Sequence, residues 1–218
     1  MNIMNKEWKN AIDRLFDDVR FSEDKKNRKS FMKTLKLLVK TDYVKKRVYR
    51  KAALEFMKIA KSTADPIDKA YSLGWAGRCY EDYGDNRLAA TCYAAASELA
   101  PSDTFAAERL GDYFWESDSA ESVRQYNRVL EYDPVCSRAY YKLGKLHSNL
   151  GEFDKAVDRY QKAIEVHNGY IAPIAEAAIE YAKKGDKENT IRMFFLAMAN
   201  DVYEFEKLEE SITICLNN

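Results

Sequence analysis

The fold is decided by residues 137–166, which read SRAYYKLGKLHSNLGEFDKAVDRYQKAIEV. Apolar residues recur every three or four positions on both sides of Gly151, and this spacing is typical of two amphipathic helices. Glycine suits the end of a helix because it adopts the left-handed conformation without steric cost. The stretch therefore predicts two helices joined by a short turn at Gly151.

The same pattern recurs along the chain. Gly144 and Tyr160 have counterparts in Gly77 and Tyr93, which lie two repeat units earlier. One of these two units is a single residue shorter than the other. A further copy follows after residue 170, so the chain holds an internal repeat of helix pairs.

The intermediate copy contains Gly111 and Tyr126 and is the shorter unit. The shortening falls near Asp118, at the turn between the two helices. The other copies carry a glycine at this turn, and this one does not. We therefore expect the turn at Asp118 to be tighter or built differently.

The pattern resembles the tetratricopeptide repeat, a unit of about 34 residues with large apolar, Gly, Tyr, Ala and Pro positions. The resemblance implies an all-α fold, namely a right-handed superhelical solenoid of helix–turn–helix repeats. It places four repeats at 70–103, 104–136, 137–170 and 171–203. Residues 204–218, with an apolar stripe from Phe205 to Cys215, resemble the helix that caps many such arrays.

Residues 1–65 contain no glycine and predict about three helices, near 5–20, 27–41 and 43–63. The third of these echoes the second half of a repeat, so a degenerate fifth repeat is one interpretation of this segment. Trp8 and Trp75 are both expected in the core.

The charge of the chain is zero overall but unevenly distributed. Residues 21–65 carry a net charge of +9, and residues 66–218 carry −9. Five basic residues crowd the third predicted helix: Lys45, Lys46, Arg47, Arg50 and Lys51. This basic patch has three interpretations, namely a solvated surface, a site for nucleic acid or another anionic surface, or a dock for an acidic protein, including a second copy.

The sequence contains no recognisable catalytic motif. It contains no glycine-rich phosphate loop, no HExxH pair and no GxSxG turn. The two histidines, His147 and His167, are far apart in the sequence, and the four cysteines form no CxxC pair. We therefore expect no enzyme activity, no metal and no cofactor, and free cysteines that pack as small apolar residues, with a Cys79–Cys92 disulfide as the alternative.

No stretch is apolar enough to span a bilayer, and the N-terminus does not resemble a signal peptide. The expected location is the cytoplasm.

In tetratricopeptide arrays the first helix of each repeat lines a concave groove, and the resemblance carries this property onto an equivalent stripe of residues. The predicted groove residues are Tyr71, Gly74, Arg78, Glu81, Phe105, Glu108, Asp112, Trp115, Arg138, Tyr141, Lys142 and Lys145, with Ala172, Ala175 and Ile179 in the last repeat. The alternative for the aromatic members is packing against neighbouring helices. Both asparagines and the first lysine of the clamp that binds chaperone tails are missing at the corresponding positions, which argues against that partner. Arg138 and Lys142 leave capture of a C-terminal carboxylate as an open alternative.

The predicted function is a scaffold that holds a peptide or helix of a partner protein in this groove, in an adaptor, chaperone or immunity-type role. The alternative is a nucleic-acid-associated regulator that binds through the basic N-terminal helices.

Overall fold

The computed structural model describes residues 42–167, 170–199 and 213. In this part of the chain all regular structure is helical, with nine helices and no strand. The predicted all-α fold class is thus confirmed. The chain divides into two compact units, Met1–Arg109 and Leu110–Asn218, with the boundary inside one helix.

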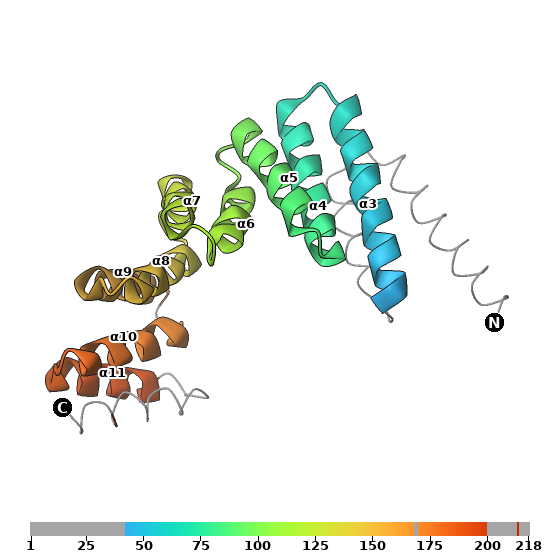
Figure 1. Cartoon of the computed structure of the whole chain (residues 1–218). Coiled ribbons are helices and arrows are strands. Elements are labelled where there is room, and N and C mark those ends of the chain that lie inside the picture. The colour runs from blue at the N-terminus through green and yellow to red at the C-terminus, as the bar shows by residue number, and fades with distance from the viewer. Residues whose placement is uncertain (1–41, 168–169, 200–212, 214–218) are drawn as a thin grey trace. The chain divides into compact units, whose positions relative to one another are not determined.

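The first unit contains α3 (Asp42–Ser62), α4 (Pro66–Tyr83), α5 (Asn86–Leu99) and the beginning of α6 (Thr104–Phe114). Helix α4 packs against both α3 and α5 (Figure 1). It starts with Pro66, whose missing N–H costs nothing in a first turn, and Asp65 caps it by accepting from the N–H of Ile67. Gly84 ends it at a φ of 97°.

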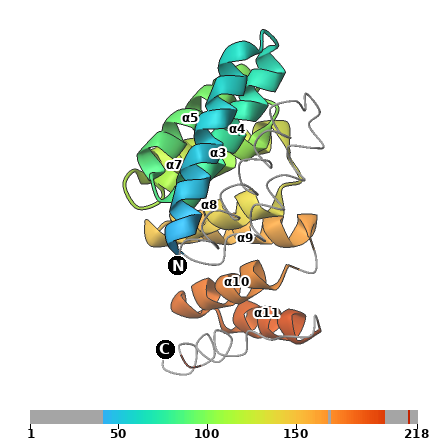
Figure 2. The same ribbon diagram turned by 90° about the vertical axis from the view of Figure 1, so that its right-hand side faces the viewer.

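The second unit contains the rest of α6, followed by α7 (Ser119–Tyr132), α8 (Ser137–Asn149), α9 (Phe153–Val166), α10 (Ile171–Lys183) and α11 (Lys187–Ala199). Helix α10 packs against both α9 and α11 (Figure 2). The helix pairs α8/α9 and α10/α11 turn at Gly151 and Gly185, which both have a positive φ. The predicted turn at Gly151 is confirmed.

The turn between α6 and α7 has no glycine. Helix α6 ends at Phe114, and the N–H of Asp118 donates to the carbonyl of Phe114 at 2.8 Å. The carboxylate of Asp118 then accepts from the N–H of Glu121 at 2.9 Å and caps α7. This turn is therefore built differently from the glycine turns, as the sequence predicts.

In three of the helix pairs, a glycine of the first helix lies against a tyrosine ring of the second helix. A Cβ atom added at Gly77 would approach the ring of Tyr93 to 2.7 Å, and one at Gly144 would approach Tyr160 to 2.5 Å. Gly111 has the same relation to a tyrosine of α7. Because these tyrosines are almost fully buried, the missing side chain is what allows the two helices of a pair to approach so closely.

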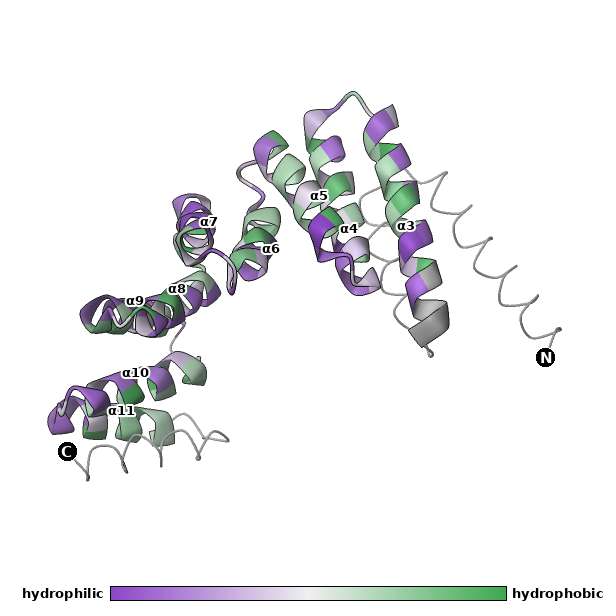
Figure 3. Cartoon of the chain, in the orientation of Figure 1, coloured by the Kyte–Doolittle hydropathy of each residue, from purple (hydrophilic) through white to green (hydrophobic). Residues whose placement is uncertain are grey.

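The helices carry apolar residues toward their neighbours and polar residues elsewhere, so both colours appear along each ribbon (Figure 3). The core of the second unit includes Tyr160, Ile174 and Ala178. Among the described helices none is both long and apolar enough to cross a membrane.

Helix α3 agrees with the third predicted N-terminal helix and buries Ala53 and Ala60 against its neighbours. The two helices expected before it, Trp8, and the capping segment 204–218 lie outside the described residues. The division into a basic N-terminal segment, four repeats and a cap remains a prediction.

Candidate functional site

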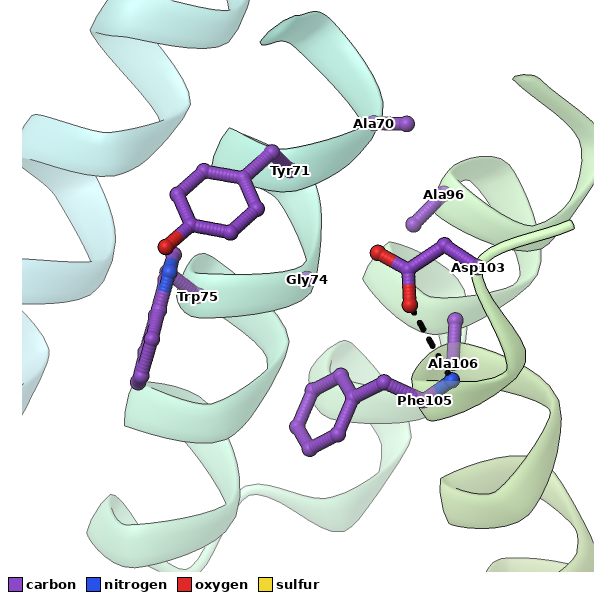
Figure 4. A pocket seen from close by; sticks show the side chains of 8 residues that line it. All are labelled: Ala70, Tyr71, Gly74, Trp75, Ala96, Asp103, Phe105 and Ala106. Atoms are coloured by element: carbon purple, nitrogen blue, oxygen red, sulfur yellow. Dashed lines mark hydrogen bonds between the residues drawn. The ribbon is translucent and has the colours of Figure 1, made fainter. Parts of the chain in front are cut away.

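An apolar cavity opens in the first unit on the side of α4 where the groove is predicted (Figure 4). Its volume is about 210 Å³. Helices α4 and α5 and the start of α6 line it with small residues, three aromatic rings and one carboxylate: Ala70, Tyr71, Gly74, Trp75, Ala96, Asp103, Phe105 and Ala106.

The rings are held in place from behind by other aromatic residues. Trp75 stacks on Phe56 of α3 with ring centres 6.3 Å apart, and Tyr71 meets Trp75 edge to face at 6.0 Å. Phe105 contacts Tyr93 edge to face at 5.9 Å and is 39% exposed. The cavity walls are therefore preorganised and still accessible to a ligand.

The floor of the cavity exists because the residues there are small. A Cβ atom at Gly74 would lie 3.8 Å from the ring of Phe105, in ordinary van der Waals contact. A large side chain at Gly74, Ala96 or Ala106 would fill the space. In Figure 4 the carboxylate of Asp103 points into the cavity from the side opposite Tyr71.

The structure brings together Tyr71 and Phe105, which the sequence assigns to the groove on separate helices. It corrects the prediction for Trp75, which is expected in the core but is half-buried, with one face on Phe56 and a share in the cavity wall. Trp75 follows Tyr71 by one helical turn and so lies on the same helical face, a signal that the sequence contains. Asp103 lies in the connection before α6, so the helical spacing that predicts the groove residues does not include it.

The predicted charged groove residues of the first unit take part in packing. Arg78 lies 3.5 Å from Asp82 on its own helix. Glu81, which the stripe of α4 also contains, accepts from the hydroxyl of Tyr93 at 2.8 Å and pairs with Arg109 of α6. Glu108 is half-buried on α6. Of these side chains, Glu81 links neighbouring helices.

Asp112 is the centre of the polar cluster in the second unit. It accepts a hydrogen bond of 2.7 Å from the hydroxyl of Tyr126. Arg138 and Lys142 of α8 reach the same carboxylate at 3.0 and 2.8 Å. Lys142 also lies over the ring of Trp115, with its nitrogen 4.7 Å from the ring centre. The two cations that the sequence offers for capturing a partner's carboxylate are therefore already paired.

Tyr141 and Lys145 continue this face along α8. Tyr141 contacts the rings of Tyr160 and Tyr170 at 6.1 and 5.4 Å. Lys145 lies 5.9 Å from the centre of the Tyr141 ring and 3.7 Å from Glu176 of α10. The face of α8 is thus both aromatic and cationic.

In the last repeat the groove prediction is wrong. Ala175 is fully buried in the core of the second unit, and Ile179 is only 8% exposed. Only Ala172 of this set is half-buried, so α10 offers little apolar surface at the predicted positions.

The basic patch lies on α3. Lys46 and Arg50 are exposed and Lys51 is half-buried, whereas the side chains of Lys45 and Arg47 fall outside the described residues. Val48, Tyr49 and Ala52 form the buried face of the same helix. Lys58 and Lys61, further along, are also exposed.

No group of three or more histidine, cysteine, aspartate or glutamate side chains in the described part of the chain could hold a metal ion. The Nδ1 atom of His147 lies 2.6 Å from Glu152, within a turn.

Cys79, Cys92 and Cys136 are free, so the alternative of a disulfide between the first two is wrong. Burial raises the pKa of Cys92 to about 11, which opposes nucleophilic reactivity.

A sequence model of the tetratricopeptide repeat family matches residues 116–171. The peroxisomal targeting signal receptor of Kluyveromyces lactis is 26% identical over 135 residues, which cover 61% of this chain and 23% of that receptor. The chain spans only 11% to 23% of the length of the curated relatives that it matches.

Solved structures extend the likeness over more of the chain. The crystal structure of MamA has a TM-score of 0.62 and 26% identity, covering 77% of this chain and 93% of that one. YrrB, described as a TPR protein with an unusual peptide-binding site, has a TM-score of 0.63 and 17% identity, covering 93% of this chain and 96% of that one.

Together with the helix pairs and their glycine–tyrosine contacts, these matches show a tetratricopeptide-repeat fold, with the repeat family's own model matching residues 116–171.

Proposed function

We propose that the chain is a scaffold that binds a segment of a partner protein, and that the cavity between α4 and α6 anchors this segment. The observation that carries the proposal is the grouping of Tyr71, Trp75 and Phe105 around a space with a floor of small residues. Aromatic side chains dominate the energetics of many interfaces because they bury large areas at low entropic cost. A side chain of the partner that enters this space would contact all three rings.

The size of the cavity supports a macromolecular partner. Sites for small molecules usually measure about 300–1,000 Å³, whereas this one measures about 210 Å³. It suits a single side chain presented by a peptide or helix. The receptor of Kluyveromyces lactis, whose name describes recognition of a targeting signal, is consistent with this mode of binding.

The second unit has its own candidate contact surface, formed by the face of α8 and by Trp115 beside Lys142. Trp115, Tyr141 and Lys145 are all partly accessible there. Because Arg138 and Lys142 are paired with Asp112, we propose that this face contributes stacking and peripheral charge. A dedicated pocket for a C-terminal carboxylate is not part of the proposal.

We further propose that the chain acts by binding and not by catalysis. The carboxylates that face the groove, Glu81 and Asp112, hold tyrosine hydroxyls and cations of neighbouring helices, as structural groups do. The free thiols of Cys79, Cys92 and Cys136 support a reducing compartment such as the cytoplasm.

A second candidate function rests on α3. Lys46, Arg50, Lys58 and Lys61 recur at helical spacing and are exposed, so they form one basic face. Such a face would bind nucleic acid weakly and with steep salt dependence. A gel-shift at low salt with excess DNA or RNA tests it, and no retention of the nucleic acid would exclude it.

The main proposal is tested by affinity purification of the full chain from its source cell at low and moderate salt, with mass spectrometry of the bound proteins. A partner retained at both salts is then titrated against Phe105→Ala, with Tyr132→Ala as the matched control because Tyr132 is exposed on α7. We expect a loss of affinity of about tenfold or more for the first variant only. Equal affinity of both variants would refute the anchor.

A further inference from the structure

The cavity between α4 and α6 has one formal charge in its lining. Seven of its eight lining residues are uncharged at neutral pH, and the eighth is Asp103. Its carboxylate points into the space, on the side opposite Tyr71 (Figure 4). A ligand that fills the cavity therefore meets three aromatic rings and a negative charge together.

We propose that the cavity takes a lysine or arginine side chain of the partner segment. This inference rests on the proposed function and specifies the chemistry of its anchor residue. The apolar stem of the side chain would pack on Ala70, Gly74 and Ala106, and the cationic head would lie among the rings and toward Asp103.

The rings favour such a head because the face of an aromatic ring carries partial negative charge. A cation within about 6 Å of a ring centre is attracted, most strongly by tryptophan. The same unit of the protein would supply Trp75, Tyr71 and Phe105 from two helices, so the head would be surrounded instead of touching one ring. An uncharged side chain would gain the packing but neither the attraction to the rings nor that to Asp103.

The segment that lines the cavity carries a net negative charge, whereas α3 behind Trp75 is basic. Residues 66–109, which form α4, α5 and the start of α6 in the first unit, contain four basic and seven acidic residues. Arg78 and Arg109 are each engaged with a carboxylate of the unit. Asp103 therefore acts on a cation at short range, inside the cavity, where the distance is well within one Debye length of about 8 Å at physiological salt.

Asp103 can be tested without disturbing the helix that follows it. Its Oδ1 atom accepts from the N–H of Phe105 at 3.2 Å, at the start of α6. Asparagine retains this acceptor and the shape of the side chain but removes the charge. Asp103→Asn is therefore a charge-specific variant, and Glu98→Gln, at an exposed position outside the cavity lining, is its matched control.

The experiment is a selection of binders from a displayed library of random peptides on the full-length protein. Each selected peptide is retested on Phe105→Ala to keep those that depend on the cavity. We expect these peptides to share a lysine or arginine at one position. Its replacement by norleucine, which keeps an apolar stem without the charge, should weaken binding about tenfold.

Asp103→Asn should weaken the same peptides roughly three- to tenfold, whereas Glu98→Gln should leave them unchanged. Cavity-dependent peptides that share an apolar residue, or that bind Asp103→Asn as tightly as the native chain, would overturn the cation inference and leave the anchor in place. A selection with no cavity-dependent peptide would overturn both the inference and the proposed anchor.

Discussion

The hydroxyl of Tyr126 donates to Oδ1 of Asp112 at 2.7 Å, and this carboxylate also binds Arg138 and Lys142 of the next first helix. One side chain thus joins α6, α7 and α8. Glu81 does the same in the first unit, where it accepts from Tyr93 and pairs with Arg109. Glu81 and Asp112 are therefore structural connections between successive repeats.

Asp112→Ala should lower the free energy of unfolding by about 1–3 kcal/mol, because the hydroxyl of the fully buried Tyr126 loses its acceptor. Asp112→Asn should cost less, about 1 kcal/mol, since an amide oxygen still accepts and the lost ion pairs are partly exposed. Urea denaturation measures both. Glu131→Ala, at an exposed position of α7, is the control, and an equal effect of all three variants would contradict this role of Asp112.

Gly144→Ala should destabilise the protein by about 1–3 kcal/mol, because its Cβ atom would lie 2.5 Å from the ring of Tyr160. Gly151→Ala makes a useful contrast, since nothing lies within 4 Å but φ is +72°. Its cost is backbone strain of about 1 kcal/mol, which Asn should relieve in part. Thermal melts distinguish the two mechanisms, because Gly144→Asn should be no better tolerated than Gly144→Ala.

Gly74→Ala should separate stability from binding. The added methyl group meets Phe105 only at 3.8 Å, and alanine is up to about 1 kcal/mol better than glycine in a helix. The free energy of unfolding should therefore stay constant or rise. The methyl group projects toward the cavity, so affinity for the partner should fall severalfold. A variant with native stability and native affinity would show that the partner does not occupy the cavity.

Alkylation should reach Cys136 well before Cys92, since Cys136 is half-buried and burial raises the pKa of Cys92 to about 11. Quenched iodoacetamide labelling with peptide mapping measures the two rates.

The thiol of Cys92 releases its proton near pH 9 in the unfolded chain but only near pH 11 in the folded protein. The unfolded state thus binds fewer protons between these values, and the stability should decline there as the pH rises. Cys92→Ser should reduce this decline.

The period of the sequence predicted the helix pairs because each repeat buries the same small and aromatic positions, as Gly77 and Tyr93 show. The residues of the candidate site were predicted from the sequence only in part. Tyr71 and Phe105 were predicted because they lie on helical stripes, whereas Asp103 lies in a connection to which no helical period applies. Ile179 was misplaced because burial in the last repeat depends on the helices packed around it. The pairing of Arg138 with Asp112 depends on side-chain conformation across two helices, which no spacing in the sequence encodes.

The turn at Asp118 has a consequence for protein engineering. The stretch from Gly111 to Tyr126 is one residue shorter than the equivalent stretches from Gly77 to Tyr93 and from Gly144 to Tyr160. The close approach of glycine to ring is nevertheless the same in all three. The connection is thus one residue shorter, and the packing between the two helices is unchanged. Foreign sequences, such as an epitope or a fluorescent reporter, should therefore be accepted between Glu116 and Ser117, which leaves Trp115 and the capping Asp118 in place.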